Sequence, residues 1–250
     1  MLSKNRIKYI HSLELAKIRK EEQAFIAEGF KTVGELLGKF PCKLLIALPE
    51  WLKDNPTPAA TEVCEVTQEE LQKASLLKTP QKVLAVFQQP TYSVDATLPQ
   101  RELCLALDDV QDPGNLGTIV RIADWFGIEH IFCSRNTVDV FNPKVVQASM
   151  GAVARVQVHY VDLESFIKSM PPTPVYGTFL EGKTIYTEQL TAHGLIIMGN
   201  EGKGISDKIK QLVTHKLFIP NYPQGRETSE SLNVAIATSI TCAEFRRRLS

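Results

Sequence analysis

The sequence has no apolar run long enough to cross a membrane. Its apolar stretches, such as residues 195–198, are only a few residues long, whereas a membrane-spanning helix needs about 20. The start of the chain, from Met1 to Arg6, also lacks the apolar core of a secretory signal. These absences argue against a helical membrane protein and an exported protein, so we expect a cytoplasmic protein with no membrane partner.

Cysteine and histidine are sparse, and neither has the spacing of a metal site. The five cysteines are Cys42, Cys64, Cys104, Cys133 and Cys242. They are odd in number and none forms a C-x-x-C pair, which is typical of reduced thiols and not of a disulfide framework. The 5 histidines include no H-E-x-x-H arrangement. We therefore expect buried thiols and no metal.

Neither sign of charge dominates the chain. The 28 Lys and Arg residues balance 28 Asp and Glu residues, which is a mild argument against a nucleic-acid partner. The basic residues nonetheless gather in two segments, residues 4–31 and residues 246–248. A solvated helix face or cations near a helix C-terminus would explain each cluster equally simply. Charge alone therefore does not predict RNA binding.

A chain of 250 residues can form one large domain or two small ones. Residues 92–100 are polar, contain Pro99 and have no clear periodicity. We place a domain boundary there, which gives an N-terminal domain of residues 1–98 and a C-terminal domain of residues 99–250. In the first domain we expect a helical segment over 12–38, broken around 25–29, and strands over 43–48 and 83–87. Thr67, with Glu70 three residues later, predicts a capped helix start.

After the boundary the pattern alternates between strands and helices. The expected strands are residues 102–107, 130–133, 153–158, 175–179, 194–198 and 216–219. The expected helices are residues 117–126, 142–150, 163–169, 206–213 and 232–248. This alternation predicts a parallel α/β sheet. Active sites in such sheets lie at the carboxyl ends of the strands, so the loops after residues 107, 198 and 219 are the candidates.

The first candidate loop runs from Asp108 into a helix. Pro113 and Gly114 form a turn, and Asn115 can cap the helix that follows. Arg121 falls on the side of this helix opposite its apolar stripe. Taken alone, Asn115 is more simply an N-cap and Arg121 a solvated surface cation.

The second candidate loop contains Gly199, Gly202 and Gly204. Three glycines in six residues let a ligand approach the backbone closely. The spacing is neither a dinucleotide fingerprint nor a P-loop. Its place after a strand still suggests an adenosine-type ligand, and an irregular turn is the alternative. Glu201 in this loop is either a solvated turn residue or holds a polar group of a substrate.

The third candidate loop begins at Ile219 and Pro220, because proline ends a strand. It leads into the last helix, for which Ser231 is a candidate N-cap. Asn233 is less expected within a first helical turn. The apolar spacing along this helix predicts its core face at Leu232, Ile236, Ile240 and Ala243.

Together the three loops resemble the SpoU/TrmH branch of the SPOUT methyltransferases. The first motif of that family, N-x-G-x-x-x-R, matches residues 115–121, and the second, a glycine loop with a glutamate, matches residues 198–204. The third, I-P followed by S-L-N-V, matches residues 219–220 and 231–234. Residues 25–29 also resemble the substrate-binding domain at the N-terminus of many members. The three motifs in this order are specific, although each alone is weak.

The resemblance implies an RNA ribose 2'-O-methyltransferase that uses S-adenosylmethionine and forms a homodimer. It implies an α/β fold: a C-terminal parallel-sheet domain with a trefoil knot, which is rare in proteins, and a small N-terminal α/β substrate-binding domain. The implied cofactor-binding residues are Gly199, Gly204, Ile219 and Leu232. The implied catalytic and substrate-binding residues are Asn115, Arg121, Glu201, Ser231 and Asn233.

Arg121 suits stabilisation of a developing alkoxide better than removal of its proton, because guanidinium stays protonated in proteins. Three other functions remain open. The substrate could be transfer RNA, although the N-terminal resemblance favours ribosomal RNA. The chain could be a catalytically silent RNA-binding protein that assists ribosome assembly. A nicotinamide-dependent oxidoreductase is disfavoured because no G-x-G-x-x-G follows the first strand of the C-terminal domain.

Overall fold

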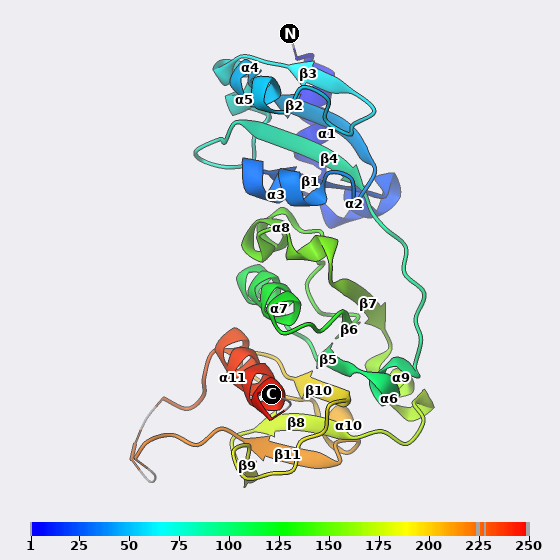
Figure 1. Cartoon of the computed structure of the whole chain (residues 1–250), viewed down its shortest axis with the longest axis vertical. Helices are drawn as coiled ribbons and strands as arrows, with labels where there is room; N and C mark the ends of the chain where they lie inside the picture. Colours follow the sequence, from blue (N-terminus) through cyan, green and yellow to red (C-terminus); the bar gives the residue numbers. More distant parts are fainter. Residues whose placement is uncertain (1, 224–225, 228, 249–250) are drawn as a thin grey trace. The chain divides into compact units, whose positions relative to one another are not determined.

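The computed structural model describes residues 2–223, 226–227 and 229–248. These residues form two compact units (Figure 1). Unit 1 comprises Met1–Thr91 and Asp139–Ala154, and unit 2 comprises Tyr92–Val138 and Arg155–Ser250. The polar stretch at residues 92–100 thus begins where unit 2 begins, but nothing in the sequence indicated that residues 139–154 join unit 1. The assignment of RNA substrate binding to residues 1–98 and of methyl transfer to residues 99–250 stays a prediction.

Unit 1 is built on a four-stranded sheet in the order β1-β4-β2-β3. β1 and β2 pair antiparallel with β4, and β3 pairs parallel with β2. The strands are β1 (Ala24–Glu28), β2 (Cys42–Ala47), β3 (Val63–Glu65) and β4 (Val83–Gln88). The helices are α1 (Lys4–Ser12), α2 (Ala16–Glu22), α3 (Phe30–Leu36), α4 (Pro49–Asp54), α5 (Gln68–Ala74), α8 (Pro143–Ser149) and the short 3-10 helix η1 (Ala152–Ala154).

The helical segment predicted over residues 12–38 is interrupted around residues 25–29, as expected, but the interruption is a strand, β1, which the sequence did not predict. All five residues of β1 are buried, so a short apolar run looks alike in a buried strand and a buried helix. Gln23 ends α2 with a left-handed φ of 46°, and Gly29 ends β1 with a φ of 95°. The capped start of α5 is confirmed: the Glu70 N–H donates to Thr67 Oγ1 at 3.3 Å, and the Thr67 N–H donates to Glu70 Oε2 at 3.1 Å.

Segment 139–154 is held in unit 1 by an aromatic cluster and by an ion pair between the buried Arg19 and the half-buried Asp139. The Phe141 ring lies 4.7 Å from the Phe25 ring on β1. The Arg19 side chain is 2 % exposed and donates from Nε and Nη2 to Asp139 Oδ2 at 2.8 and 2.6 Å. Arg19 Nη1 also donates to the carbonyls of Leu13 and Glu14. The place of Arg19 in the N-terminal basic segment had indicated a solvated basic face. The structure shows that Arg19 does not belong to such a face.

Unit 2 is built on a seven-stranded sheet in the order β7-β6-β5-β10-β8-β11-β9, and every strand pair is parallel. The prediction of a parallel α/β sheet is confirmed. The strands are β5 (Leu103–Leu107), β6 (His130–Ser134), β7 (Gln157–Val161), β8 (Val175–Phe179), β9 (Lys183–Thr184), β10 (Gly194–Met198) and β11 (His215–Phe218). The helices are α6 (Leu98–Arg101), α7 (Pro113–Trp125), α9 (Leu163–Ser169), α10 (Asp207–Lys210) and α11 (Val234–Arg247).

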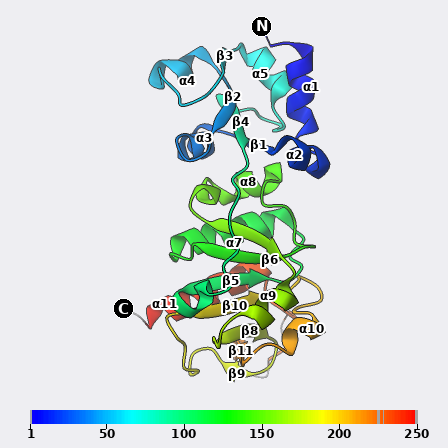
Figure 2. The same cartoon turned by 90° about the vertical axis from the view of Figure 1, so that its right-hand side faces the viewer.

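Helices cover both faces of this sheet. Alternate residues of β5 and β10, such as Cys104 and Leu195, pack in one cluster with α9 and with Ile209 of α10. Because successive strand residues face opposite sides, the intervening residues face the layer that contains α11 (Figure 2). β7 begins at residue 157 and not at 153, because residues 152–154 form η1. No helix in the described ranges has both the length and the apolar character needed to span a membrane.

α7 and α11 pack side by side and run in the same direction. Hydrogen bonds join their N-terminal ends to each other and their C-terminal ends to each other. At the first ends, Asn233 Nδ2 donates to Asn115 Oδ1 at 2.9 Å. At the last ends, Arg246 Nε donates to the Phe126 carbonyl at 2.7 Å and Nη2 to the Gly127 carbonyl at 2.9 Å. This pairing fixes where the first and third candidate loops lie.

The predicted core face of α11 was wrong. Ile236 is 52 % exposed, and Leu232, just before the helix, is 48 % exposed. The buried residues of α11 are Val234, Ala235, Thr238, Thr241, Cys242, Glu244 and Phe245. Thr238 and Thr241 can be buried because their hydroxyls donate to the carbonyls of Val234 and Ala237. The predicted stripe of Leu232, Ile236, Ile240 and Ala243 thus lies largely on the outer side of α11, with Ile240 half-buried.

The C-terminal arginines are engaged within the chain. Arg246 holds the end of α7, while Arg247 and Arg248 both pair with Glu244 at 2.8 Å. Arg248 also donates to the carbonyls of Ile185 and Glu188. A structural role therefore accounts for this basic cluster better than RNA contact does.

We predict that Arg19→Ala destabilises unit 1 by on the order of 3 kcal/mol, because Asp139 and two carbonyls lose their partner. In a Trp125→Phe background, Trp51 in α4 is the single tryptophan of the chain and reports on unit 1 in urea unfolding. Lys17→Ala is the control: Lys17 forms an exposed pair with Glu21 at 3.8 Å, and its loss should cost below about 0.5 kcal/mol. Equal effects of the two substitutions would contradict a structural role for the Arg19–Asp139 pair.

Candidate active site

The carboxyl ends of β5 and β10 bring the first and second candidate loops together. β5 and β10 are adjacent in the sheet, and β8 separates β10 from β11. The buried Asp108 at the end of β5 accepts the Ser206 N–H at 2.7 Å. Asp109 follows with a φ of 65°, and its carbonyl accepts Asn200 Nδ2 at 2.7 Å. These contacts fix residues 108–112 against the glycine loop.

Glu201 links the glycine loop to the start of α7. Its carboxylate accepts Asn115 Nδ2 at 3.0 Å, the Asp112 N–H at 3.2 Å and the Gln111 N–H at 3.3 Å. Partial burial by itself raises the pKa of Glu201, but the hydrogen bonds from Asn115 and the backbone outweigh it, and the pKa lies below its usual range. Glu201 therefore stays ionised near neutral pH and is a weak proton acceptor.

Asn233 links the third loop to the same group. Its Oδ1 accepts the N–H groups of Ala235 and Ile236 at 2.9 and 3.3 Å, which makes Asn233 the N-cap of α11. This fixes the amide so that Nδ2 faces Asn115 Oδ1, and the Asn115 amide in turn must direct Nδ2 to Glu201. The hydrogen-bond chain thus has one direction, from Asn233 through Asn115 to Glu201.

Two capping predictions were wrong. Asp112, not Asn115, caps α7, since its Oδ1 accepts the Asn115 N–H at 2.8 Å. The helix consequently begins at Pro113, one turn earlier than expected, and the Asn115 side chain is free to join Glu201 and Asn233. Ser231 is exposed and lies two residues before the actual N-cap of α11.

Asn200 shapes the glycine loop and was missed in the sequence. Its Oδ1 accepts the N–H groups of Gly202 and Lys203 at 2.9 and 3.0 Å. Its backbone exchanges two hydrogen bonds with Gly204, at 3.0 and 2.9 Å. The available signal was asparagine in a glycine-rich turn, where its side chain often bonds the backbone two residues on.

The glycines of this loop are not equivalent. A Cβ on Gly199 would overlap the backbone of Gly204 and Ile205, so this position admits no side chain. Gly204 has a φ of 69° and open space where a Cβ would stand. We call the close contact of Gly199 with the backbone of Gly204 and Ile205 the neck of the glycine loop. The neck, together with the open space beside Gly204, fits the approach of an adenosine-type ligand to Gly204. Ile219 follows β11 and is half-buried, and Leu232 precedes α11 and is exposed; their predicted cofactor contacts stay predictions.

Arg121 lies in α7 six residues after Asn115 and is exposed. Among the residues described, none forms a hydrogen bond or ion pair with its guanidinium. The structure therefore brings Asn115, Glu201 and Asn233 into contact and places Arg121 on the same helix without engaging it. An unengaged cation is available to an anionic group of a substrate.

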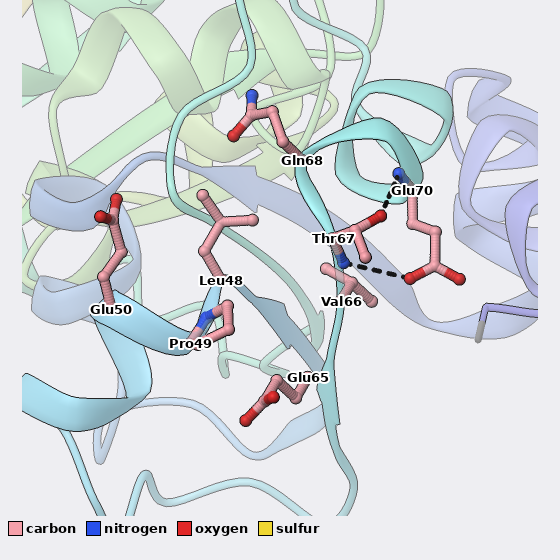
Figure 3. Close-up of a pocket in the computed structure, with 8 residues that line it drawn as sticks. All are labelled: Leu48, Pro49, Glu50, Glu65, Val66, Thr67, Gln68 and Glu70. Carbon is pink, nitrogen blue, oxygen red and sulfur yellow. Dashed lines mark hydrogen bonds between the residues drawn. The ribbon is translucent and has the colours of Figure 1, made fainter.

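A hollow of about 570 Å³ lies in unit 1 (Figure 3). It is lined by Leu48, Pro49, Glu50, Glu65, Val66, Thr67, Gln68 and Glu70. Three glutamates at its edge disfavour the phosphates of RNA, so we do not place the substrate there. Over the described ranges, no cluster of three or more His, Cys, Asp or Glu side chains could hold a metal.

We predict that Gly199→Ala reduces the affinity for S-adenosylmethionine at least tenfold, because the new methyl group forces the neck of the glycine loop open. Isothermal titration calorimetry measures the affinity. Gly202→Ala is the matched control, since its Cβ would meet only Asn200 Oδ1, at 3.8 Å. Unchanged binding by Gly199→Ala would show that the neck does not shape the cofactor site.

Two family descriptions match the chain. Residues 102–243 match the SpoU rRNA Methylase family, and residues 4–85 match the MRM3-like substrate binding domain. The chain is 29 % identical over 246 residues to the 23S rRNA (guanosine(2553)-2'-O)-methyltransferase RlmP of Bacillus subtilis, and the match covers 96 % of each chain. The predicted resemblance is therefore confirmed over both parts of the chain.

Solved structures give the same result. A putative RNA methyltransferase of the TrmH family from Porphyromonas gingivalis is 43 % identical, with a TM-score of 0.88 and 99 % coverage of both chains. The AdoMet-bound rRNA methyltransferase from Sinorhizobium meliloti is 29 % identical, with a TM-score of 0.83 and coverage of 100 % of this chain and 97 % of that one. With more than half of its length matched, at residues 102–243, this chain belongs to the SpoU rRNA methylase family.

Proposed function

We propose that this protein transfers a methyl group from S-adenosylmethionine to a ribose 2'-hydroxyl of ribosomal RNA. One observation carries the proposal: Asn115, Glu201 and Asn233, which come from three separate motifs, form a single hydrogen-bonded group at the carboxyl ends of parallel strands. This is where active sites of open α/β sheets lie. Family membership adds the reaction class, and the similarity to RlmP favours ribosomal over transfer RNA.

S-Adenosylmethionine supplies the methyl group on a positively charged sulfur. The residues proposed to hold it are Gly199, Gly204, Ile219 and Leu232, and there is open space where a Cβ of Gly204 would stand. The trefoil knot of the family belongs to the same proposal. No metal has a role in it.

Arg121 stabilises the negative charge that develops on the ribose 2'-oxygen. Its guanidinium is exposed and has no partner among the described residues, so it is free to meet that charge. A preorganised cation at a developing anion contributes on the order of 3 kcal/mol to lowering a barrier. Arg121 cannot remove the proton, because its guanidinium stays charged.

Glu201 and the two asparagines position the site. Glu201 already accepts three hydrogen bonds within the chain, and its lowered pKa makes it a weak base. The 2'-hydroxyl proton therefore leaves to water or to a substrate phosphate. Asn115 and Asn233 hold the starts of α7 and α11 together, so that ribose meets Arg121 in a fixed orientation. Ser231, exposed before α11, contacts the substrate.

The protein acts as a homodimer in this proposal. The outward stripe of α11, including Ile236, lies beside α7, whose Trp125 is 84 % exposed. An apolar stripe at helical spacing normally faces a core, and a second copy of the chain would cover it. The expected cytoplasmic location is kept in this proposal. Burial raises the pKa of Cys104 to about 12 and that of Cys42 to about 11, which keeps both thiols protonated and unreactive.

We predict that Arg121→Ala lowers the methylation rate about 100- to 1,000-fold while the affinity for S-adenosylmethionine changes less than twofold. Transfer of tritiated methyl to unmodified ribosomal RNA measures the rate, and mapping of 2'-O-methyl sites identifies the product. Arg101→Ala is the matched control, because Arg101 is an exposed arginine of unit 2 that pairs with Asp95 at 3.1 Å. Wild-type protein that methylates neither ribosomal nor transfer RNA would favour the silent assembly factor. Equal loss of rate and cofactor binding would make Arg121 structural.

We predict that Ile236→Glu converts a dimer into a monomer, because a carboxylate would be buried in the apolar contact of α11. Sedimentation velocity at micromolar concentration measures the change. Tyr186→Glu is the control, since Tyr186 is 49 % exposed in unit 2 but lies outside α7 and α11. A monomeric wild-type protein, or an Ile236→Glu dimer, would contradict this interface.

A further inference from the structure

Unit 1 exposes one aromatic ring where it begins α3. Phe30 is 65 % exposed, whereas Phe25 and Phe87 of the same unit are fully buried and stack at 5.6 Å. Phe30 is the first residue of α3 and follows β1 directly after Gly29. Exposing an aromatic ring to water costs free energy. A ring that the fold nevertheless holds in water at the start of a helix is therefore a candidate for contact with a ligand.

The end of β1 is clamped to residues 75–82, which join α5 to β4. Glu28 is buried at the end of β1. Its carboxylate accepts the Ser75 hydroxyl, and it accepts the Leu76 N–H at 2.9 Å. Ser75 Oγ in turn accepts the Leu77 N–H at 3.0 Å. The loop is therefore fixed beside the start of α3.

Gly29 completes this geometry. Its φ of 95° disfavours any other residue, and a Cβ there would lie 2.8 Å from Oε1 of Gln81. The Gly29 N–H donates to the Val83 carbonyl at 2.9 Å. The chain thus turns beside Gln81, and Phe30 follows this turn next to the 75–82 loop.

Two lysines lie on the same elements as the Phe30 ring or on the loop beside it. Lys31 follows Phe30 on α3, and Lys78 lies in the clamped loop. Both are exposed, and neither has an ion pair or hydrogen bond within the part of the chain that the structure describes. The surface is therefore an aromatic ring with unneutralised positive charge.

We propose that Phe30 stacks on an unpaired base of the substrate RNA while Lys31 and Lys78 contact the phosphates beside that base. This inference rests on the proposed function and names the residues of unit 1 that hold the RNA. Single-stranded nucleic acid binds where aromatic rings meet cationic side chains, because every base has a face to stack. A protein partner fits less well, because lysine is depleted at protein interfaces.

Stacking is tested with a fluorescein-labelled oligouridylate of 12 nucleotides and the full chain. Phe30→Ala weakens binding about tenfold, and Phe30→Trp, which keeps a ring, binds within twofold of wild type. Leu15→Ala is the matched control, because Leu15 is a 61 % exposed apolar residue of the same unit, and it leaves binding unchanged. Equal binding by Phe30→Ala and wild type overturns the proposal, as does equal weakening by Leu15→Ala.

The lysines are tested by the salt dependence of the same binding. Lys31→Gln and Lys78→Gln each reduce the slope of log affinity against log salt by about 0.7, the value for one phosphate contact on a single strand. Lys8→Gln is the control, since Lys8 is exposed on α1 of the same unit, and it leaves the slope unchanged. Slopes that do not differ among the three variants overturn the phosphate contacts.

Methyl transfer to unmodified ribosomal RNA separates this inference from the proposed function. Phe30→Ala raises the KM for RNA about tenfold while kcat and the affinity for S-adenosylmethionine stay at wild-type values. Wild-type protein without transfer activity refutes the proposed function, and the binding comparison of Phe30→Ala with Leu15→Ala still decides this proposal. A change in oligomeric state on Phe30→Ala, measured by sedimentation velocity, assigns the surface to a second copy and overturns the proposal.

Discussion

The proposed active site depends on the amide of Asn115, which donates to Glu201 and accepts from Asn233. One side chain thereby joins segments that are 86 and 118 residues away along the chain. The amide can do this because Asp112 takes the capping role at α7 and leaves Asn115 free. Glu201 completes the arrangement, since the backbone N–H groups that hold its charge also close the first loop.

The parallel pairing of α7 and α11 keeps this group in place. Asparagines tie the two helices at their first ends, and Arg246 ties them at their last ends. The pairing buries threonines and turns an apolar stripe outward, which an isolated helix would not favour. In the proposed dimer, that outward stripe links assembly to the same two helices that carry Asn115, Arg121 and Asn233.

Arginine and lysine have different roles in this neutral chain. Arg19, Arg246 and Arg248 donate several hydrogen bonds each to carbonyls or carboxylates of the fold. The planar guanidinium suits such fixed contacts. Arg121, Lys31 and Lys78 stay exposed. The charge available to RNA is therefore set by which cations the fold leaves unpaired, and not by the number of cations in a segment.

The sequence by itself determined the parallel α/β sheet, through its alternation of strands and helices, and the capped start of α5, through spacing within a few neighbouring residues. It also indicated the three loops of the candidate site, through the order of their motifs. It did not determine that Ala24–Glu28 is a strand, that residues 139–154 join unit 1, or that Asn233 caps α11. These three features depend on tertiary contacts: on the elements that pack against a buried apolar segment, and on which backbone N–H groups a side-chain oxygen accepts. An apolar stripe such as that of α11 indicates that one side of a helix is to be shielded from water. Only the tertiary structure decides which side of the helix packs against the rest of the same chain.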